Sequence, residues 1–235
     1  MMHYLKARSN DLLHFFFPHT CAGCGSDLVQ QQEEICISCY ASLPETGFAS
    51  IPGNPVEKMF YGRIPVTAAS SSYYFTKESS LQQLIHALKY EGNQAVGLQL
   101  GAWCAQHLAI SQRFSSVDVM LPMPIFPEKL KKRGYNQAEV ICRGMEQELQ
   151  VPVRTDLVLR TKQTETQTRK GRSERWTNVQ GSFQLQHETE LAGKHLLLVD
   201  DVVTTGATLE ACAGVLLQAQ PASVSIVTLA WASND

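Results

Sequence analysis

Residues 196–209, LLLVDDVVTTGATL, decide the fold of this chain. The stretch begins with four apolar residues, 196–199, a pattern typical of a short strand buried on both faces of a parallel sheet. Two carboxylates, Asp200 and Asp201, follow directly and are expected at the C-terminal end of that strand. A loop of small residues then leads into an apolar helical pattern from Leu209 onward. The order of strand, acidic pair, small-residue loop and helix indicates an α/β domain.

The small-residue loop has the chemistry of a phosphate site. A loop that opens a helix presents unpaired backbone N–H groups and the positive end of the helix dipole, which suits one phosphate group. Asp200 and Asp201 can accept hydrogen bonds from vicinal sugar hydroxyls, directly or through a divalent cation. The predicted ligand is therefore a ribose 5-phosphate. The phosphate-binding residues would be Thr204, Thr205, Gly206, Ala207 and Thr208.

The alternative is an ordinary buried strand followed by a Thr/Gly turn. Burying charge without a partner is costly. This alternative gives no reason for two adjacent acids at the end of a buried strand.

This stretch resembles the phosphoribosyl pyrophosphate (PRPP) motif of the type I phosphoribosyltransferases, and its details resemble the ComF family of competence-associated, phosphoribosyltransferase-like proteins. The resemblance implies an α/β type I phosphoribosyltransferase fold, a parallel sheet flanked by helices, with a small N-terminal four-cysteine zinc module. It also implies that Asp200 and Asp201 act at the ribose of PRPP, and that Mg²⁺ binds together with PRPP.

Composition and charge narrow the class of protein. The 235 residues can hold one α/β domain and a small appendage, and a hydrophobic share of 44% is ordinary for a globular protein. A net charge of -2 argues against binding nucleic acid by charge alone. However, residues 129–175 carry twelve Lys and Arg against six Asp and Glu, so this window suits a polyanionic ligand.

The N-terminal sequence predicts a cytoplasmic protein. The apolar run at residues 12–17 is too short for a secretory core and has no small-residue cleavage site. No segment approaches the roughly 18 apolar residues of a membrane span. Seven cysteines, an odd number, make a disulfide framework a poor interpretation.

Four of the cysteines have the spacing of a metal site. They form two C-x2-C pairs separated by eleven residues, and four thiolates make a closed tetrahedral site for a structural zinc ion. A redox pair and free thiols are the alternatives. The flanking sequences LLHFFFPHTCAGCG and ICISCYASLP also resemble the N-terminal segment of ComF proteins. The predicted ligands are Cys21, Cys24, Cys36 and Cys39.

The rest of the chain divides into a linker and a main domain. We expect the zinc-binding module over residues 1–45, a Pro- and Gly-rich linker over 46–65 and the phosphoribosyltransferase-like domain over 66–235. Strands are expected at 66–75, 117–121, 157–160 and 224–231, and helices at 81–90 and 95–108. The segment LQQLIHALKYEGN resembles the first helix of the ComF catalytic domain, which implies that Lys89 contacts PRPP.

A second ligand-binding segment is expected after the strand at 117–121. Prolines there stiffen a loop, cations gather beside it, and Gly134 permits a turn into a helix that begins near Tyr135 or Asn136. We expect this loop, residues 122–133, at the same sheet edge as Asp200, where it would hold pyrophosphate. PMPIFPEKLKKRGYNQAEVI resembles the patterned segment of ComF proteins, which implies roles for Pro124 and Arg133. A solvated basic face is the alternative for the lysines.

Residues 161–178 are predicted to be disordered or to form a functional lid. The run is polar, rich in Thr and Gln, and long for a structureless connection inside a compact domain. A lid would shield the cationic transition state of ribosyl transfer from water. Arg172, which matches the Arg of the family's lid, is the expected anion contact and is assigned a catalytic role with Asp200 and Asp201.

Two classes of function remain open from the sequence. The first is a glycosyltransferase that uses PRPP, with the role in natural competence and DNA uptake that the resemblance implies. The second is a non-catalytic nucleotide- or PRPP-sensing adaptor whose zinc module docks a DNA-processing, helicase-like protein. Direct binding of single-stranded DNA by the basic window is a third possibility. Thr204 stands where 6-oxopurine phosphoribosyltransferases carry a carboxylate, which predicts poor activity on hypoxanthine or guanine.

Overall fold

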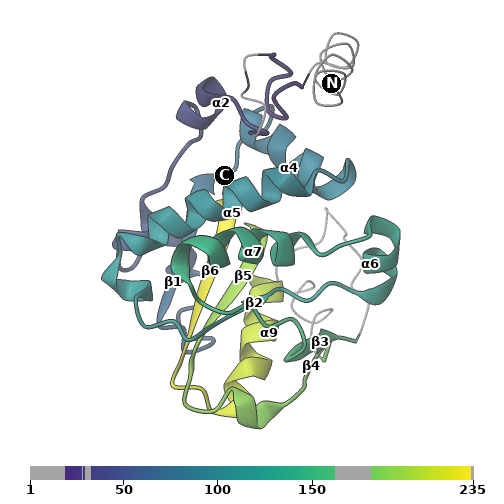
Figure 1. The fold of residues 1–235 in the computed structure, drawn as a ribbon. Helices are drawn as coiled ribbons and strands as arrows, with labels where there is room; N and C mark the ends of the chain where they lie inside the picture. Colours follow the sequence, from purple (N-terminus) through teal and green to yellow (C-terminus); the bar gives the residue numbers. More distant parts are fainter. Residues whose placement is uncertain (1–18, 28, 30–32, 162–180, 234–235) are drawn as a thin grey trace, which may run out of the picture.

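The computed structural model describes residues 19–27, 29, 33–161 and 181–233. Its centre is a sheet of four parallel strands in the order β1-β6-β5-β2 (Figure 1). The strands are β1 (Ala68–Tyr74), β2 (Val119–Pro122), β5 (His195–Val203) and β6 (Ser223–Trp231). Helices cover both faces of this sheet, which agrees with the parallel sheet flanked by helices that the sequence predicts.

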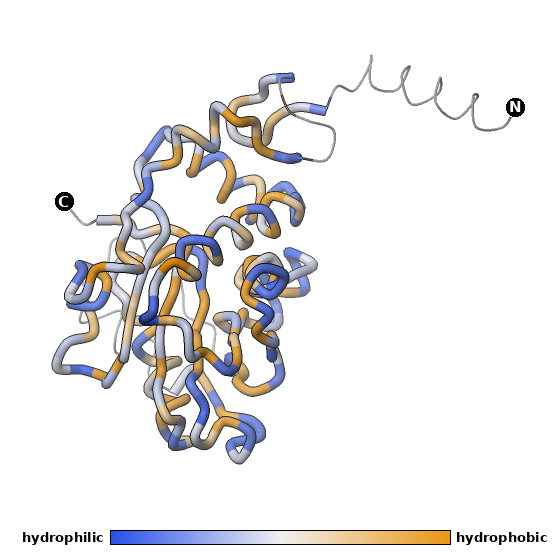
Figure 2. Tube along the Cα trace, turned by 60° about the vertical axis from the view of Figure 1, so that its left-hand side comes forward, coloured by the Kyte–Doolittle hydropathy of each residue, from blue (hydrophilic) through white to orange (hydrophobic). Residues whose placement is uncertain are grey.

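Strand β5 forms because its apolar residues are buried on both faces. Leu196, Leu198 and Ile226 belong to one hydrophobic cluster, whereas Leu197, Val199 and Val227 belong to the other. This alternation is the period of two that a strand imposes. The strand is longer than its apolar run, because it continues through Asp200 and Asp201 to Val203. Figure 2 shows the apolar residues gathered along the central strands.

Three helices cover one face of the sheet and a fourth covers the other. Helices α4 (Ser80–Tyr90), α5 (Gln94–Ala109) and α7 (Gln137–Leu149) bury their apolar faces in the cluster that contains Leu197. Helix α9 (Ala207–Leu216) buries Leu209, Cys212 and Leu216 in the cluster that contains Leu196. In Figure 1, α5 and α7 lie in front of the strands and α9 lies behind them.

The cysteine-bearing segment shares the core of the main domain. Ile35, Cys36 and Leu43, around helix α2 (Ile37–Ala41), belong to the same hydrophobic cluster as Leu84 and Leu88 of α4. No separate core is therefore present in the described part of this segment. The domain boundaries at 45 and 65 stay a prediction.

Residues 46–65 cross from the cysteine-bearing segment to the sheet in short helices, η1 (Phe48–Ser50) and α3 (Pro55–Lys58). They bury Phe48, Val56 and Phe60 in the α9-side cluster, so this proline-rich stretch contributes core residues as well as a connection. Just before it, Glu45 bridges Tyr73 in antiparallel fashion and so covers the edge of β1.

Two features differ from the expected elements. The predicted strand at 157–160 exists as β3 (Val158–Arg160), but it pairs antiparallel with β4 (Phe183–Leu185) outside the main sheet. Residues 122–133 are not a loop throughout, because Pro127–Arg133 forms helix α6. The remaining short helices are η2 (Gln112–Phe114), η3 (Glu188–Glu190) and η4 (Leu217–Ala219). Within the described ranges, no helix has the length and apolar character needed to cross a bilayer.

Candidate functional site

The acidic pair lies at the C-terminal end of β5, and its two side chains face opposite sides of the sheet. Asp200 follows the alternation of Leu196 and Leu198 toward α9, and Asp201 follows Leu197 and Val199 toward α4. Their partners confirm this: Asp201 Oδ2 lies 2.8 Å from Lys89 Nζ of α4, and both side chains are mostly buried. The structure thus brings together Lys89 and Asp201, two of the predicted site residues that lie far apart in the sequence.

The surroundings of Asp200 disfavour the charged form of its carboxyl. Burial, and next the charge of Asp201, raise the pKa of the Asp200 carboxyl to about 7. The backbone N–H of Asp201, which donates to Asp200 Oδ1 at 2.9 Å, acts in the opposite direction, as do Lys89 and Arg160. A carboxyl with this pKa changes its protonation state near neutral pH, and it accepts hydrogen bonds from hydroxyl groups more strongly when it is ionised.

Arg160, at the end of β3, provides positive charge on the Asp200 side. Its guanidinium lies 5.4 Å from the centre of the Phe183 ring, and burial lowers its pKa. The pair of strands β3 and β4 therefore carries a half-buried cation to the neighbourhood of Asp200. The strands β3 and β4 are separated in the sequence by the predicted lid, residues 161–178. Arg172 belongs to that stretch and lies outside the described residues.

The predicted phosphate loop joins β5 to α9. Gly206 caps α9 with a φ of 75°, a left-handed conformation that favours glycine. A Cβ at Gly206 would also lie 3.2 Å from the Phe60 ring, so the loop rests directly on residues that precede the sheet. The loop stays open to a ligand on its outer side, because Thr204 is exposed and Thr205 and Thr208 are half-buried.

A salt bridge ties the first turn of α9 to the same supporting segment. Arg63 donates to Glu210 Oε2 at 3.0 Å, and the Glu210 side chain is mostly buried. The role of Phe60 and Arg63 in supporting the loop was not predicted from the sequence. Residues 46–65 show no sustained period, and no local signal marks a contact with residues 150 positions away.

The RGYNQ segment, residues 133–137, anchors the start of α7 to neighbouring elements. Asn136 caps the helix by accepting from the N–H of Ala138 at 3.1 Å, and its amide donates to the Met123 carbonyl at 3.0 Å. The Tyr135 hydroxyl donates to the Leu88 carbonyl of α4, and the Arg133 guanidinium lies 5.5 Å from the centre of the Tyr90 ring. This segment therefore holds the last turn of α4, which carries Lys89.

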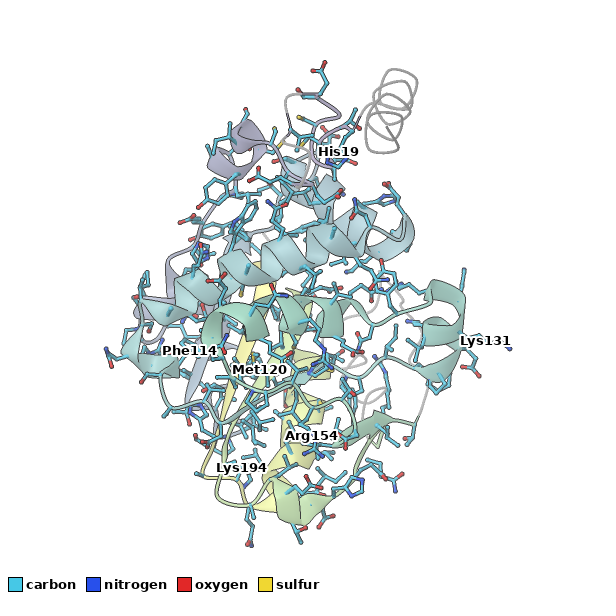
Figure 3. The ribbon with its side chains drawn as sticks, in the orientation of Figure 1. His19, Phe114, Met120, Lys131, Arg154 and Lys194 are labelled. Atoms are coloured by element: carbon cyan, nitrogen blue, oxygen red, sulfur yellow. The ribbon has the colours of Figure 1, made fainter. Side chains whose placement is uncertain are left out.

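Pro124 and Arg133 lie at the two ends of the connection formed by residues 123–126 and α6. Met123 donates to the Val199 carbonyl at 2.7 Å, so the connection leaves β2 beside the residue that precedes the acidic pair in β5. Arg133 donates to Gln137 Oε1, and Lys131 lies on the outer side of α6, as Figure 3 shows. Arg133 thus stays close to the α4 terminus, whereas Lys131 is exposed and has the surroundings of a solvated lysine.

The four cysteines form a second candidate site, away from the sheet edge. Their sulfur atoms all lie within 4.8 Å of one another, and Cys24 Sγ is 3.7 Å from Cys36 Sγ. A tetrahedral ion with metal–sulfur bonds of about 2.3 Å requires sulfur atoms about 3.8 Å apart, so the donor set fits a metal ion. The cluster of Cys21, Cys24, Cys36 and Cys39 can therefore bind a metal such as zinc.

Backbone N–H groups prepare the cluster for binding a metal. Burial alone would raise the pKa of the Cys21 thiol, but N–H groups of Cys36, Gly23 and Cys24 lower it to about 6. Burial and the neighbouring thiols raise the pKa of Cys39. A Cβ at Gly23 would lie 2.9 Å from Cys39 Sγ, so this position requires glycine.

Comparison with known proteins shows which proteins the chain resembles. The model of the phosphoribosyl transferase domain matches residues 132–234. Competence protein F of Haemophilus influenzae is 26% identical, with 82% of this chain and 76% of that protein covered. Competence protein ComFC of Bacillus subtilis is 26% identical, with 86% of each chain covered. These matches support the resemblance to the ComF family.

Other relatives have a different name. DNA utilization protein YhgH of Salmonella typhimurium is 27% identical over 201 residues, with 84% of each chain covered. A glutamine PRPP amidotransferase from B. subtilis, solved with ADP and GMP, is 15% identical with a TM-score of 0.42, and the match covers 62% of this chain and 30% of that chain. The domain match begins at residue 132, so Lys89 and the cysteine cluster lie outside it.

Proposed function

We propose that this protein binds PRPP or a related ribose 5-phosphate ligand at the C-terminal edge of its sheet and transfers the phosphoribosyl group. One observation carries the proposal: at this edge an acidic pair leads directly into an accessible loop that opens α9. Asp200 and Asp201 would hold the ribose hydroxyls. Residues 204–208 would bind the 5-phosphate through backbone N–H groups and threonine hydroxyls.

The reaction would break the bond between the anomeric carbon and the pyrophosphate oxygen, while a nucleophile forms a bond to that carbon. The leaving pyrophosphate takes the electron pair, and the protein contributes position and electrostatics. Arg133, together with the connection that begins at Pro124, would stabilise the departing charge, with Arg172 as a further anion contact. Mg²⁺ bound to PRPP would neutralise part of the pyrophosphate charge.

The acidic pair itself does not fit a magnesium ion held by both carboxylates. The two side chains face opposite sides of the sheet. Asp201 is already paired with Lys89, whose Nζ lies 2.8 Å from Asp201 Oδ2. Mg²⁺ demands near-octahedral oxygen ligands at about 2.0–2.1 Å, which two diverging carboxylates do not supply.

At the cysteine cluster we propose a structural zinc ion. Four thiolates close the coordination sphere and leave no open position for catalysis. The zinc-bearing segment would hold the N-terminal part of the core together and would offer a docking surface to a partner in DNA uptake, such as a helicase-like protein. This role in competence and DNA utilisation is consistent with the names of the relatives.

A second candidate function is a PRPP or nucleotide sensor that keeps the ligand contacts without turnover. The salt bridge between Lys89 and Asp201 favours it, because a resident counter-ion stabilises an empty site. Direct binding of single-stranded DNA rests on the basic window at 129–175 and a few aromatic side chains, and Lys131 and Lys132 are exposed in that window.

Pyrophosphate release separates these functions. The zinc-loaded protein is incubated with magnesium PRPP and a panel of bases and amines, and binding is measured in parallel by calorimetry. Binding with release identifies a transferase and directs attention to the acceptor. Binding without release supports the sensor, and absence of binding contradicts both.

A further inference from the structure

Lys89 is positioned more firmly than a surface lysine. Its ammonium lies 2.8 Å from Asp201 Oδ2, with the two side chains only 21% and 14% exposed. The turn that carries it is held from both sides, because Tyr135 bonds the Leu88 carbonyl and Arg133 lies over Tyr90. Leu88 itself is fully buried. The Lys89 ammonium therefore has a fixed position at the edge of the sheet.

The ion pair of Lys89 is with Asp201 and not with the neighbouring carboxylate. Asp200 faces the opposite side of the sheet, toward Arg160 and α9, and its Oδ1 accepts a hydrogen bond from the N–H of Asp201. The charges of Lys89 and Arg160 both lower the pKa of Asp200, but Asp201 is the acid in direct contact with the ammonium. A divalent cation at Asp201 would have to displace an ammonium of low exposure and would find one carboxylate in place of two.

We propose that Lys89 is the resident cation of the ribose site and occupies the place at Asp201 that a protein-held divalent metal would take. The inference rests on the proposed function and adds its cofactor requirement: the ribose 5-phosphate part of the ligand binds without a metal ion. Magnesium then enters only with ligands that carry pyrophosphate, bound to the pyrophosphate oxygens.

Ribose 5-phosphate is the probe that isolates this prediction, because it has no pyrophosphate to chelate metal. Its affinity for the zinc-loaded protein is measured by calorimetry with 5 mM Mg²⁺, about a saturating level for a weak carboxylate site, and in buffer passed over a chelating resin. A free chelator is avoided, because it would strip the cysteine cluster. We expect the affinity to change less than about threefold between the two buffers; a change of threefold or more overturns the inference.

Variants of Lys89 test the ammonium directly. In metal-free buffer, Lys89→Met is expected to weaken ribose 5-phosphate binding at least about tenfold, and Lys89→Arg, which keeps the charge, to stay within about threefold of wild type. Lys194→Met is the matched control, because Lys194 precedes the opposite end of β5 (Figure 3). Zinc content and thermal midpoint show that each variant is folded. Wild-type affinity in Lys89→Met, or a loss in Lys89→Arg equal to that in Lys89→Met, contradicts the proposal.

A manganese titration without any sugar tests the role of Lys89 separately from the proposed function. Mn²⁺ bound to the zinc-loaded wild type and to Asp201→Asn is followed by electron paramagnetic resonance. Equal binding by both is expected, whereas a saturable site that Asp201→Asn removes overturns the inference and leaves the proposed function standing. If the wild type binds ribose 5-phosphate in neither buffer, the proposed function fails and the inference falls with it.

Discussion

At the scale of single residues, ionisation of Asp200 favours ligand binding but lowers the stability of the folded protein. A ligand that donates hydroxyl hydrogens binds more strongly to the ionised carboxylate. Burial and the charge of Asp201, however, raise the pKa of Asp200 from 3.8 to about 7. Between pH 4 and 7 the folded protein therefore holds a proton that the unfolded chain releases. Stability falls as pH rises through this window, because the proton must be lost at a cost.

Asp200→Asn is expected to remove this cost. The amide keeps the acceptor for the N–H of Asp201, so the ligand-free variant should be more stable than wild type at pH 8 by about 1–4 kcal/mol, the upper limit being the full pKa difference. Urea unfolding at pH 5 and pH 8 measures it. The stabilisation should shrink at pH 5, and equal pH dependence in both proteins would show that Asp200 does not titrate as described.

Thr204 restricts which bases can accept the phosphoribosyl group. The loop that follows Asp201 contains no carboxylate, and the exposed Thr204 cannot deprotonate a purine base. We expect negligible pyrophosphate release with hypoxanthine or guanine, and no gain in ribose 5-phosphate affinity in Thr204→Asp. Strong turnover of either purine by the wild type would contradict this assignment.

At the scale of elements, the phosphate loop depends on a segment remote in sequence. Gly206 combines a φ of 75° with close contact to Phe60, whereas Gly214, later in the same helix, has open space around its Cβ position. Gly206→Ala should cost about 1–3 kcal/mol of stability and weaken ribose 5-phosphate binding, because the loop must shift away from Phe60.

Gly214→Ala is the matched control for this change. Alanine in a helix with open space should be neutral or stabilising by up to about 1 kcal/mol. Chemical denaturation and calorimetric titration of the two variants test the pair. Similar ligand affinity in both variants would mean that the loop conformation is not what binds the phosphate.

Some elements could be predicted from local sequence and others could not. The buried run 196–199 predicted β5, and helical spacing predicted α4 and α5, because each pattern reflects the face that the element buries. Helix α6 was missed although Pro127 at its start and Gly134 after its end are the usual signals for a short helix. The continuation of β5 through two acids was not predictable from hydrophobicity, because partners on other elements neutralise them.

At the scale of the whole molecule, the cysteine cluster and the sheet share one core. Cys36 and Ile35 pack in the same cluster as Leu84 and Leu88, next to the turn that carries Lys89. Removing the metal should therefore destabilise the molecule as a unit. We expect the metal-stripped protein and Cys39→Ser to unfold at lower temperature, in a single calorimetric transition. A separate early transition that leaves the main one unmoved would show an independent module.

The site as a whole could be predicted only in part. The acidic pair, the phosphate loop, Lys89 and the four cysteines were all named from motifs, and the structure places Lys89 against Asp201 and gathers the four sulfurs. The divergence of the two acids follows from strand geometry once β5 is known to continue through them. The support from Phe60 and Arg63 depends on tertiary packing, which leaves no local pattern.

The central claim is that the edge formed by Asp200, Asp201 and residues 204–208 binds a ribose 5-phosphate group. Calorimetric titration of magnesium PRPP into the zinc-loaded wild type, and into Asp200→Ala and Asp201→Ala, tests it most directly. We expect saturable binding to the wild type, loss of binding in both variants and one zinc ion per chain in all three proteins. Normal PRPP binding by the two variants would contradict the site assignment.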